Sequence, residues 1–556
     1  MKQIQTTHKI ISGKITFSVL LLFTIFYNVV NAQYSQGGQP YSFGDNLREI
    51  ALELPKQEIL PAFDLAPLIK EDSINDENKA PFRFGYNHTV NYSFSNSGTW
   101  TVLPNGDRLW QLSIKSAGAL ALNLAFEDFF MPEGAKLFIY SADKNQVTGA
   151  FTKLNNQEDK GFATDLILGD AVVLEYYEPA EVAHQGQLKV FRVTHSYRAI
   201  KDYIGKSFGK SGTCQQNINC TIGANWQKEK NAVVFLIING STVCSGTLIN
   251  DVAQDSKPYV LTANHCGSTG YNTWVFRFNW EAPGCSNPST SPSSLSLSGC
   301  VKRASSAASD FSLVEISGGL VGMTIPASYN PYFAGWSRDN IPATSATCIH
   351  HPTGDIKKIS QALNATQSNF FSGADCWRVG KWTTGCTEGG SSGSGLFDQN
   401  HRLIGQLFGG PSDCAANTID MYDNFGKFAT SWLGEGTDDT QLKHWLDPDN
   451  TDTLMINGTD SLTLGIPTYD AQTISALNIY PNPSSGNFNF QITLTKPQLV
   501  TAKVYDMLGQ TICIKSFPNI LNEVYTIDLN SENNGIYFME ISTPNYKLVK
   551  KISLLK

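Results

Sequence analysis

Cysteine is absent from residues 33–206, although the chain of 556 residues contains 11 cysteines. All but one of the cysteines lie between residues 214 and 414, and Cys513 stands alone near the end. The sequence also lacks Cys-x-x-Cys pairs, and this absence disfavours a structural zinc site. An even set of cysteines confined to one segment of an exported chain instead predicts disulfides.

Charge is scarce as well, because only 16% of the residues are charged and the net charge is −8. A nucleic-acid partner is therefore not expected, since phosphate binding needs clustered Lys and Arg. Polar turn-forming residues are plentiful, and this balance is typical of β-rich secreted proteins.

Long apolar runs are missing after the first 30 residues. Lys2, Lys9 and Lys14 precede an apolar run over 15–30, and Ala32 closes a small-residue cleavage site. We interpret residues 1–32 as a secretory signal peptide, with a retained signal anchor as the alternative. No second run is long enough to span a membrane as a helix, so the mature form is expected to lack a transmembrane segment.

The remaining chain divides into four segments. Residues 33–206 show alternating apolar and polar stretches, such as 108–114 and 136–140, and predict a β-sandwich. Residues 207–455 contain many short apolar strands and ten cysteines, which favours an all-β pair of barrels. Residues 456–473 resemble a linker, and residues 474–556 predict a further small β-sandwich.

Three short motifs in the second unit point to nucleophilic catalysis. His265 follows an apolar strand, Asp310 opens another, and Ser392 lies in the glycine-rich turn Gly390-Ser-Ser-Gly-Ser-Gly. A serine hydroxyl needs an imidazole to accept its proton and a carboxylate to orient that imidazole. The glycines allow a tight turn in which the N–H groups of Gly390 and Ser392 form an oxyanion hole. Each motif alone is weak, but the three occur in one unit in the order of chymotrypsin-like enzymes.

Residues 207–455 resemble the bacterial lysyl endopeptidases over nearly their full length. The matching motifs are Leu261-Thr-Ala-Asn-His-Cys-Gly, Asp310-Phe-Ser-Leu-Val-Glu, Phe333-Ala-Gly-Trp, Ile349-His-His-Pro, Gly390-Ser-Ser-Gly-Ser, Gly405-Gln-Leu-Phe-Gly-Gly-Pro-Ser and Thr430-Ser-Trp. This resemblance implies a two-barrel trypsin-like fold that cleaves after lysine. The triad would be His265, Asp310 and Ser392.

The resemblance also implies three disulfides, Cys214–Cys414, Cys220–Cys285 and Cys244–Cys266. Four cysteines of the unit remain. Cys376 and Cys386 are close enough in sequence to pair, which would leave Cys300 with Cys348.

The substrate pocket is inferred from the same resemblance. In trypsin the carboxylate that binds the substrate cation lies six places before the nucleophile, but that place is Cys386 here. The family supplies this carboxylate from a later segment that matches Asp423, downstream of Gly409 and Gly410, and Asp420 is the alternative. The His and Trp that the family places beside the pocket correspond to Phe408 and to Phe370 or Phe371.

Activation must differ from that of trypsin, because Ser391 occupies the place of the aspartate that pairs with the new N-terminus. Residues 33–206 resemble the family's propeptide in position and size, so folding assistance and temporary inhibition are expected. Lys206 and Lys210 lie in a Gly/Ser linker and are predicted sites of cleavage.

Residues 474–556 resemble the sorting domain of the type IX secretion system. The features that carry this resemblance are Tyr480-Pro-Asn-Pro, Val504-Tyr-Asp-Met-Leu-Gly-Gln, Gly535-Ile-Tyr-Phe and the final lysine-rich strand. It implies export across the outer membrane of a Gram-negative bacterium, with the secretion machinery as a partner. An adhesive or carbohydrate-binding β-domain is the alternative.

Together these features predict a secreted, monomeric serine endopeptidase that acts on protein or peptide substrates. No cofactor or metal is expected. Two other functions stay open: an inactive trypsin-fold binding protein, and a protease with broader Lys/Arg specificity.

Overall fold

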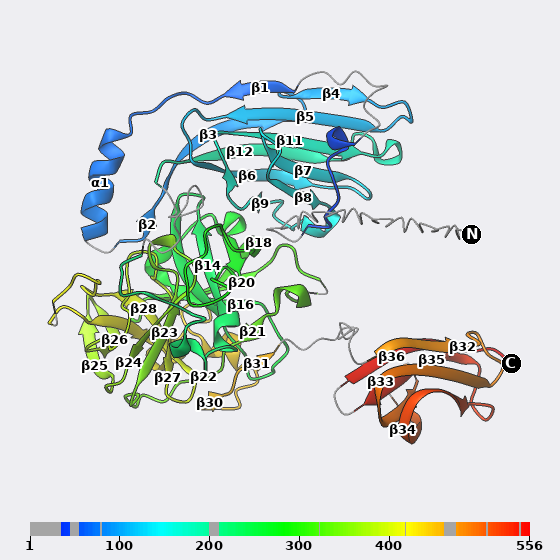
Figure 1. Ribbon diagram of the computed structural model, residues 1–556. Helices are drawn as coiled ribbons and strands as arrows, with labels where there is room; N and C mark the ends of the chain where they lie inside the picture. Colours follow the sequence, from blue (N-terminus) through cyan, green and yellow to red (C-terminus); the bar gives the residue numbers. More distant parts are fainter. Residues whose placement is uncertain are drawn as a thin grey trace, which may run out of the picture.

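The structure is a computed structural model that describes residues 35–44, 55–77, 80–198, 211–321, 323–417, 419–460, 474–506, 510–543 and 546–556 (Figure 1). The predicted signal peptide and both predicted cleavage sites, Lys206 and Lys210, lie outside these residues. No helix in the described ranges is long and apolar enough to cross a membrane.

The first unit is a sandwich of two β-sheets around one apolar core. One sheet contains β1 (Lys56–Ile59), β4 (Thr99–Val102), β5 (Arg108–Lys115), β7 (Lys136–Ser141), β8 (Val147–Phe151) and β11 (Ala171–Glu178). The other contains β3 (Gly85–Ser93), β6 (Ala121–Phe130), β9 (Phe162–Ala163), β10 (Ile167–Leu168) and β12 (Gln187–Ser196). Both faces of β5 and β7 are buried, so the polar Gln111 and Ser113 of the alternating β5 sequence are buried as well.

One helix of the first unit was not expected from the sequence. Helix α1 (Ala66–Glu77) has no apolar stripe and lies at the side of the sandwich, where it leads into β2 (Phe82–Arg83) (Figure 1). Arg83 fastens the helix to this strand through its ion pairs with Glu71 and Asp72, at 2.9 and 2.8 Å.

The second unit consists of two mainly antiparallel sheets, which form the two barrels. The first sheet contains β14 (Val233–Ile238), β15 (Thr242–Leu248), β16 (Tyr259–Ala263), β17 (Val275–Phe278), β18 (Leu295–Ser298), β19 (Cys300–Ser306) and β20 (Phe311–Ile316). The second contains β13 (Gln216–Asn217), β22 (Trp336–Ser337), β23 (Ala346–His350), β24 (Lys358–Ala362), β25 (Gln367–Phe371), β26 (Ala374–Val379), β27 (Gly395–Asp398), β28 (Leu403–Gly409), β29 (Asp423–Lys427) and β30 (Met455–Ile456). Only two short α-helices occur in its described residues, α2 (Phe428–Leu433) and α3 (Lys443–Leu446), beside several single-turn 3-10 helices. The prediction of an all-β double-barrel protease fold is confirmed.

The predicted end of this unit at residue 455 is too early. Strand β30 pairs with β22, and β31 (Thr459–Asp460) pairs with β21 (Tyr332–Phe333). The polar, glycine-containing sequence at 456–460 resembles a linker, but its backbone completes edges of the protease fold. The unit therefore extends to residue 460.

The first two units share a core rather than meeting at a loose boundary. Strand β2 pairs with β15 of the first barrel, with Phe82 opposite Val243. Phe82, Phe84 and Ala163 pack in one cluster with Phe235 and Trp280 of the protease unit.

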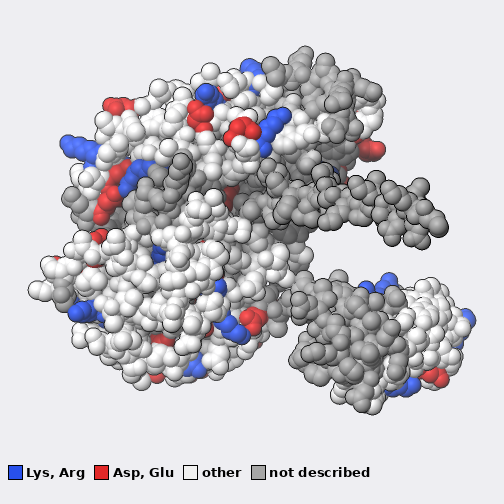
Figure 2. All heavy atoms as spheres, viewed as in Figure 1, with Lys and Arg blue, Asp and Glu red and all other residues white. Residues whose placement is uncertain are grey.

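Charged side chains cross the same boundary. Arg277 of the protease unit and Asp165 of the first unit form an ion pair, and both are buried. Their Nε–Oδ2 distance is 2.9 Å. On the face drawn in Figure 2, the described acidic and basic side chains are scattered and form no continuous basic surface.

The C-terminal unit contains β32 (Ile474–Tyr480), β33 (Asn487–Tyr505), β34 (Thr511–Asp528), β35 (Gly535–Thr543) and β36 (Tyr546–Leu554). The first part of β33 pairs with β32, and its last residues pair with β35. The pairing register with β34 shifts between these parts. Phe488 and Phe490 from the first part share a core with Val500, Ala502 and Val504 from the second, as expected for a small β-sandwich.

Candidate active site

The three candidate catalytic residues lie at the ends of strands in the protease unit. His265 follows β16, Asp310 precedes β20, and these two strands pair with each other. Ser392 lies just before β27 of the second sheet, and its carbonyl oxygen accepts a hydrogen bond from Ser245 N on β15, at 2.8 Å. The turn therefore contacts the first barrel, and the site lies where the two sheets meet.

Asp310 holds His265 through both carboxylate oxygens. Its Oδ2 is 2.7 Å from His265 Nδ1, and its Oδ1 accepts the backbone N–H of His265 at 3.0 Å. The carbonyl oxygen of Asp310 also accepts the backbone N–H of Asn264 at 2.8 Å. Asp310 is 3% exposed, so little water competes for these bonds. With Nδ1–H donating to the carboxylate, Nε2 is the basic nitrogen of the ring.

The Nε2 atom of His265 is buried and has no hydrogen-bond partner among the described residues. No hydrogen bond joins it to the Ser392 hydroxyl in this structure, as is common in enzymes without substrate. The two residues are nevertheless held close together, because the Ser392 turn packs on the end of β16. A Cβ atom on Gly393 would lie 2.1 Å from Thr262 Oγ1 and 2.8 Å from Ala263 N.

The glycine turn presents unused backbone donors. Gly390 has φ +90°, a conformation that side chains disfavour. The carbonyl oxygen of Gly389 accepts Thr353 N at 2.5 Å, and that of Gly390 accepts Ser245 Oγ at 3.1 Å. No hydrogen bond within the described residues uses the N–H of Gly390 or Ser392, so both are available to a developing oxyanion.

Ser391, next to the candidate nucleophile Ser392, belongs to a buried chain of polar side chains. Its hydroxyl is 2.8 Å from His350 Nδ1, and His350 Nε2 is 2.9 Å from Ser360 Oγ. Burial, and secondarily the Lys358 charge, lower the pKa of His350 to about 3. His350 is therefore neutral at physiological pH and helps to fix the turn that carries Ser392.

Asp423 begins β29 and is fully buried. Its Oδ2 accepts hydrogen bonds from Trp382 Nε1 at 2.6 Å, Thr387 Oγ1 at 2.9 Å and Ser412 Oγ at 2.5 Å. Its Oδ1 lies beside Gly410, where an added Cβ would be 2.5 Å away. The alternative, Asp420, is only half-buried and lies next to Ile419, which is 82% exposed.

An aromatic wall borders the catalytic histidine. The Phe408 ring stacks on His265 with ring centroids 5.6 Å apart, and Phe371 meets Phe408 edge-on at 5.3 Å. Phe370 is 73% exposed, so Phe371 is the one that contributes to this wall.

The three disulfides implied by the resemblance are present: Cys214–Cys414, Cys220–Cys285 and Cys244–Cys266. The last one ties β15 to the residue after His265. The suggested pairs Cys376–Cys386 and Cys300–Cys348 are wrong, because none of these four cysteines forms a disulfide with another.

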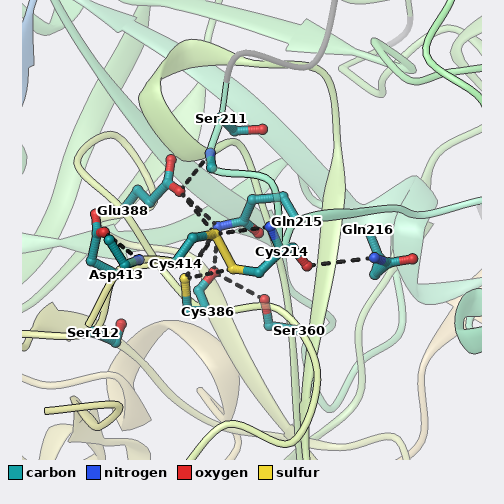
Figure 3. Close-up of a disulfide and its surroundings, with 12 residues drawn as sticks. Ser211, Cys214, Gln215, Gln216, Ser360, Cys386, Glu388, Ser412, Asp413 and Cys414 are labelled. Atoms are coloured by element: carbon teal, nitrogen blue, oxygen red, sulfur yellow. Dashed lines mark hydrogen bonds between the residues drawn. A yellow bond between two sulfur atoms is a disulfide. The ribbon is translucent and has the colours of Figure 1, made fainter. Parts of the chain in front are cut away.

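The reason for this error is spatial. Cys300 belongs to the first sheet and Cys348 to the second. The Cys386 sulfur lies 3.4 Å from Cys214 Sγ, beside the Cys214–Cys414 bond (Figure 3). These three sulfurs form the one candidate metal cluster among the described residues, but two of them are joined to each other and are not thiolates.

Sequence reasoning missed most of the supporting residues. Trp382, Thr387 and Ser412 around Asp423 come from three separate segments, and no local motif marks them. The role of Ser360 beside His350 is equally invisible in the sequence. Only the pair His350-His351 is unusual enough to have drawn attention.

Two family models and a curated relative match parts of this chain. Residues 208–426 match the family model of the lysyl endopeptidase C-terminal domain, and residues 478–554 match that of the secretion system C-terminal sorting domain. A lysyl endopeptidase from Pseudomonas aeruginosa is 27% identical over 358 residues, which are 59% of this chain and 75% of the relative.

Two solved structures are also similar in part. A thermostable serine protease from an extremophilic microorganism is 14% identical, covering 36% of this chain and 92% of that one, with a TM-score of 0.26. An HtrA-type protease with a tripeptide is 12% identical, covering 59% and 95%, also with a TM-score of 0.26.

These findings support a serine endopeptidase, whose residues 208–426 are similar to the C-terminal domain of lysyl endopeptidases. The C-terminal sorting domain marks it for export by the type IX system to the extracellular space or the cell surface.

Proposed function

We propose that this serine endopeptidase hydrolyses peptide bonds on the carboxyl side of lysine, using Ser392 as nucleophile, His265 as base and Asp310 as the orienting carboxylate. The observation that carries the triad is the double hydrogen bond from His265 to Asp310, at 2.7 and 3.0 Å. It holds the imidazole in one tautomer, with Nε2 facing the reaction.

In the first step His265 Nε2 removes the hydroxyl proton while Ser392 Oγ attacks the substrate carbonyl. The oxyanion that forms is bound by the N–H groups of Gly390 and Ser392. His265 then donates the proton to the leaving amine, and an acyl-enzyme remains. Water attacks this ester with the same base. One oxyanion donor typically contributes about 2.7–4 kcal/mol to transition-state stabilisation, so the glycine turn is as important as the triad.

Preference for lysine is assigned to Asp423. An ammonium that enters a narrow pocket loses its hydration, and a counter-charge already held in place offsets this loss. Three donors bind Oδ2 of the buried Asp423 carboxylate. Gly410 packs directly against the backbone of this segment, because an added Cβ would lie 2.4 Å from Tyr422 O and 2.5 Å from Asp423 Oδ1, so a glycine lets the β28 end approach the carboxylate closely. Phe408 and Gly409 at the end of β28, with Gly410 directly after it, form the wall along which the substrate would lie.

Residues 33–206 are proposed to act as a propeptide that folds with the protease and covers its cleft. The segment at 80–84 supports this role, because β2 adds a strand to the edge of β15. Just before that strand, the carbonyl oxygen of Ala80 would lie 3.9 Å from a Cβ on Gly389, in the oxyanion turn. The other proposed segments are the signal peptide 1–32, the protease unit from 207, a linker that begins after residue 460, and the sorting domain 474–556.

The triad can be tested with a fluorophosphonate probe and a lysyl amide substrate. Ser392→Ala should remove both labelling and hydrolysis, while the protein is still secreted with intact disulfides. Ser289→Ala is a matched control, because Ser289 lies in an exposed loop. Labelling of a residue other than Ser392, or full activity of the Ser392→Ala enzyme, would show that the nucleophile is assigned wrongly.

A further inference from the structure

The segment that follows the predicted cleavage linker is buried in the protease fold. Ser211 directly follows Lys210 and is 4% exposed. Cys214 is bonded to Cys414, and β13 pairs with β24. The chain immediately after the linker therefore has a fixed position inside the enzyme.

A buried carboxylate faces the first residue of this segment. Asp355 has no exposed surface. Its Oδ2 accepts Ser211 Oγ at 2.5 Å and Ser211 N at 3.4 Å, and it lies 3.4 Å from Lys358 Nζ. Its Oδ1 accepts Ile356 N at 2.7 Å. If the chain began at Ser211, the α-amino group would therefore lie within hydrogen-bond distance of the Asp355 carboxylate.

The segment that contains Asp355 and the segment that begins at Ser211 both contact residues 388–390, just before Ser392. Thr353, two places before Asp355, donates its N–H to Gly389 O at 2.5 Å, and a Cβ on Gly390 would lie 3.2 Å from Gly354 N. Gly212 N donates to Glu388 Oε1 at 2.8 Å. Figure 3 shows Glu388 reaching over the Cys214–Cys414 disulfide toward this segment.

Hydrolysis of the 210–211 bond changes the chemistry at this place. Water is consumed, a carboxylate forms on Lys210, and the Ser211 nitrogen becomes an amine that takes up a proton. One amide N–H is thereby replaced by an ammonium with three N–H donors and a full charge. A buried carboxylate binds such a group far better than it binds an amide.

We propose that Asp355 receives the α-ammonium of Ser211 after cleavage, and that this pair holds residues 352–355 against the oxyanion turn at Gly389 and Gly390. Asp355 is then a positioning residue for catalysis. Asp355 would bind the new N-terminus, a role that Ser391 cannot have because it lacks a carboxylate and its hydroxyl is bonded to His350. The inference rests on the proposed triad and on cleavage before Ser211.

The pair has a defined pH dependence. The charged groups facing Ser211 and its neighbour are Asp355, Lys358 and Glu388, and His351 Nδ1 bonds to the Asp355 carbonyl oxygen at 2.9 Å. An α-amino group has a pKa of about 8 in water; a carboxylate partner raises this pKa, whereas burial and the nearby Lys358 charge lower it. The pair is lost as the pH rises through the pKa of this amine.

The test uses two full-length precursors in which 206–210 is replaced by a recognition sequence for a protease that cuts after Ile-Glu-Gly-Arg. In one, the cut falls directly before Ser211. In the matched control, one inserted glycine precedes Ser211, so the mature chain has an amide there. Both are tested as wild type and as Asp355→Asn, with kcat and KM for a short lysyl amide measured from pH 6 to 10.

We expect the glycine-extended enzyme to lose at least tenfold in kcat. The alkaline fall in kcat should be present only in the form that begins at Ser211. Asp355→Asn should lower that form to the level of the extended one and cause no further loss in the extended one. Equal kcat of the two mature forms, or an equal loss from Asp355→Asn in both, would overturn the proposal.

Fluorophosphonate labelling separates this result from failure of the triad. If Ser392 is labelled and both forms hydrolyse the substrate at the same rate, only the role of Asp355 is wrong. If neither form is labelled or active, the proposed triad is wrong, and the inference that rests on it is overturned as well.

Discussion

Replacing Asp423 by Asn removes the pocket charge while changing its shape little. The amide oxygen can take the place of Oδ2 and keep the hydrogen bonds from Trp382, Thr387 and Ser412, at 2.5–2.9 Å. The Asn NH2 group then occupies the Oδ1 side, where it points N–H donors at an arriving ammonium. The fold should survive, because Trp382, Thr387 and Ser412 each keep an acceptor.

The magnitude follows from the complete burial of this carboxylate. Loss of one partner from a buried charge pair costs about 2–5 kcal/mol, which corresponds to a drop of about 30- to 5,000-fold in kcat/KM. A substrate with an uncharged side chain of the same length, norleucine, makes no such pair. Its kcat/KM should therefore change little, because the triad is untouched.

The assay compares kcat/KM for lysyl, arginyl and norleucyl amides in the wild type, Asp423→Asn and the control Asp420→Asn. Asp420 lies three residues away but is half-exposed, so its substitution should leave lysyl activity nearly unchanged. The reasoning is refuted if Asp423→Asn keeps lysyl kcat/KM within threefold of the wild type, or if Asp420→Asn shows the larger loss.

Two further predictions concern stability and export. Burial lowers the pKa of His350 to about 3, whereas a histidine in the unfolded chain has a pKa of about 6.5. Between these two values the unfolded state binds more protons than the folded state. The free energy of unfolding should therefore fall by up to about 1.4 kcal/mol for each pH unit of acidification. In urea titrations of the Ser392→Ala enzyme from pH 7 to 4, His350→Gln should flatten this slope, and an unchanged slope would contradict it. Truncation after residue 470 should lower the extracellular amount of enzyme without lowering its specific activity, and undiminished secretion would assign the tail another role.

The proposed triad could be selected from the sequence because each of its residues lies in a short local motif, and its catalytic role stays a prediction. His265, Asp310 and Ser392 each follow or precede a recognisable strand or turn, and the order of the motifs is informative. The barrels were predictable for the same reason, since apolar runs such as 233–238 and 311–316 are strands whatever they pack against.

The features that the sequence did not predict depend on contacts between distant segments. Cys386 was placed with Cys376 because they are near in sequence, but the fold puts its sulfur beside Cys214. Helix α1 has no amphipathic pattern, and ion pairs with Arg83 attach it to the next strand. Residues 456–460 resemble a linker, and only their partner strands reveal them as part of the protease fold.

Because the first two units share a core, a cut in the linker between them would not by itself separate them. Phe82 and Phe84 pack with Phe235 and Trp280, so hydrolysis between residues 199 and 210 would leave two chains in a non-covalent complex. Their separation then depends on concentration, because the covalent link no longer supplies a high effective concentration of one for the other. In a confined compartment the two halves would stay together, and dilution outside the cell would release the protease. The linker cut would then make activation irreversible, and the surrounding volume would determine when the halves separate.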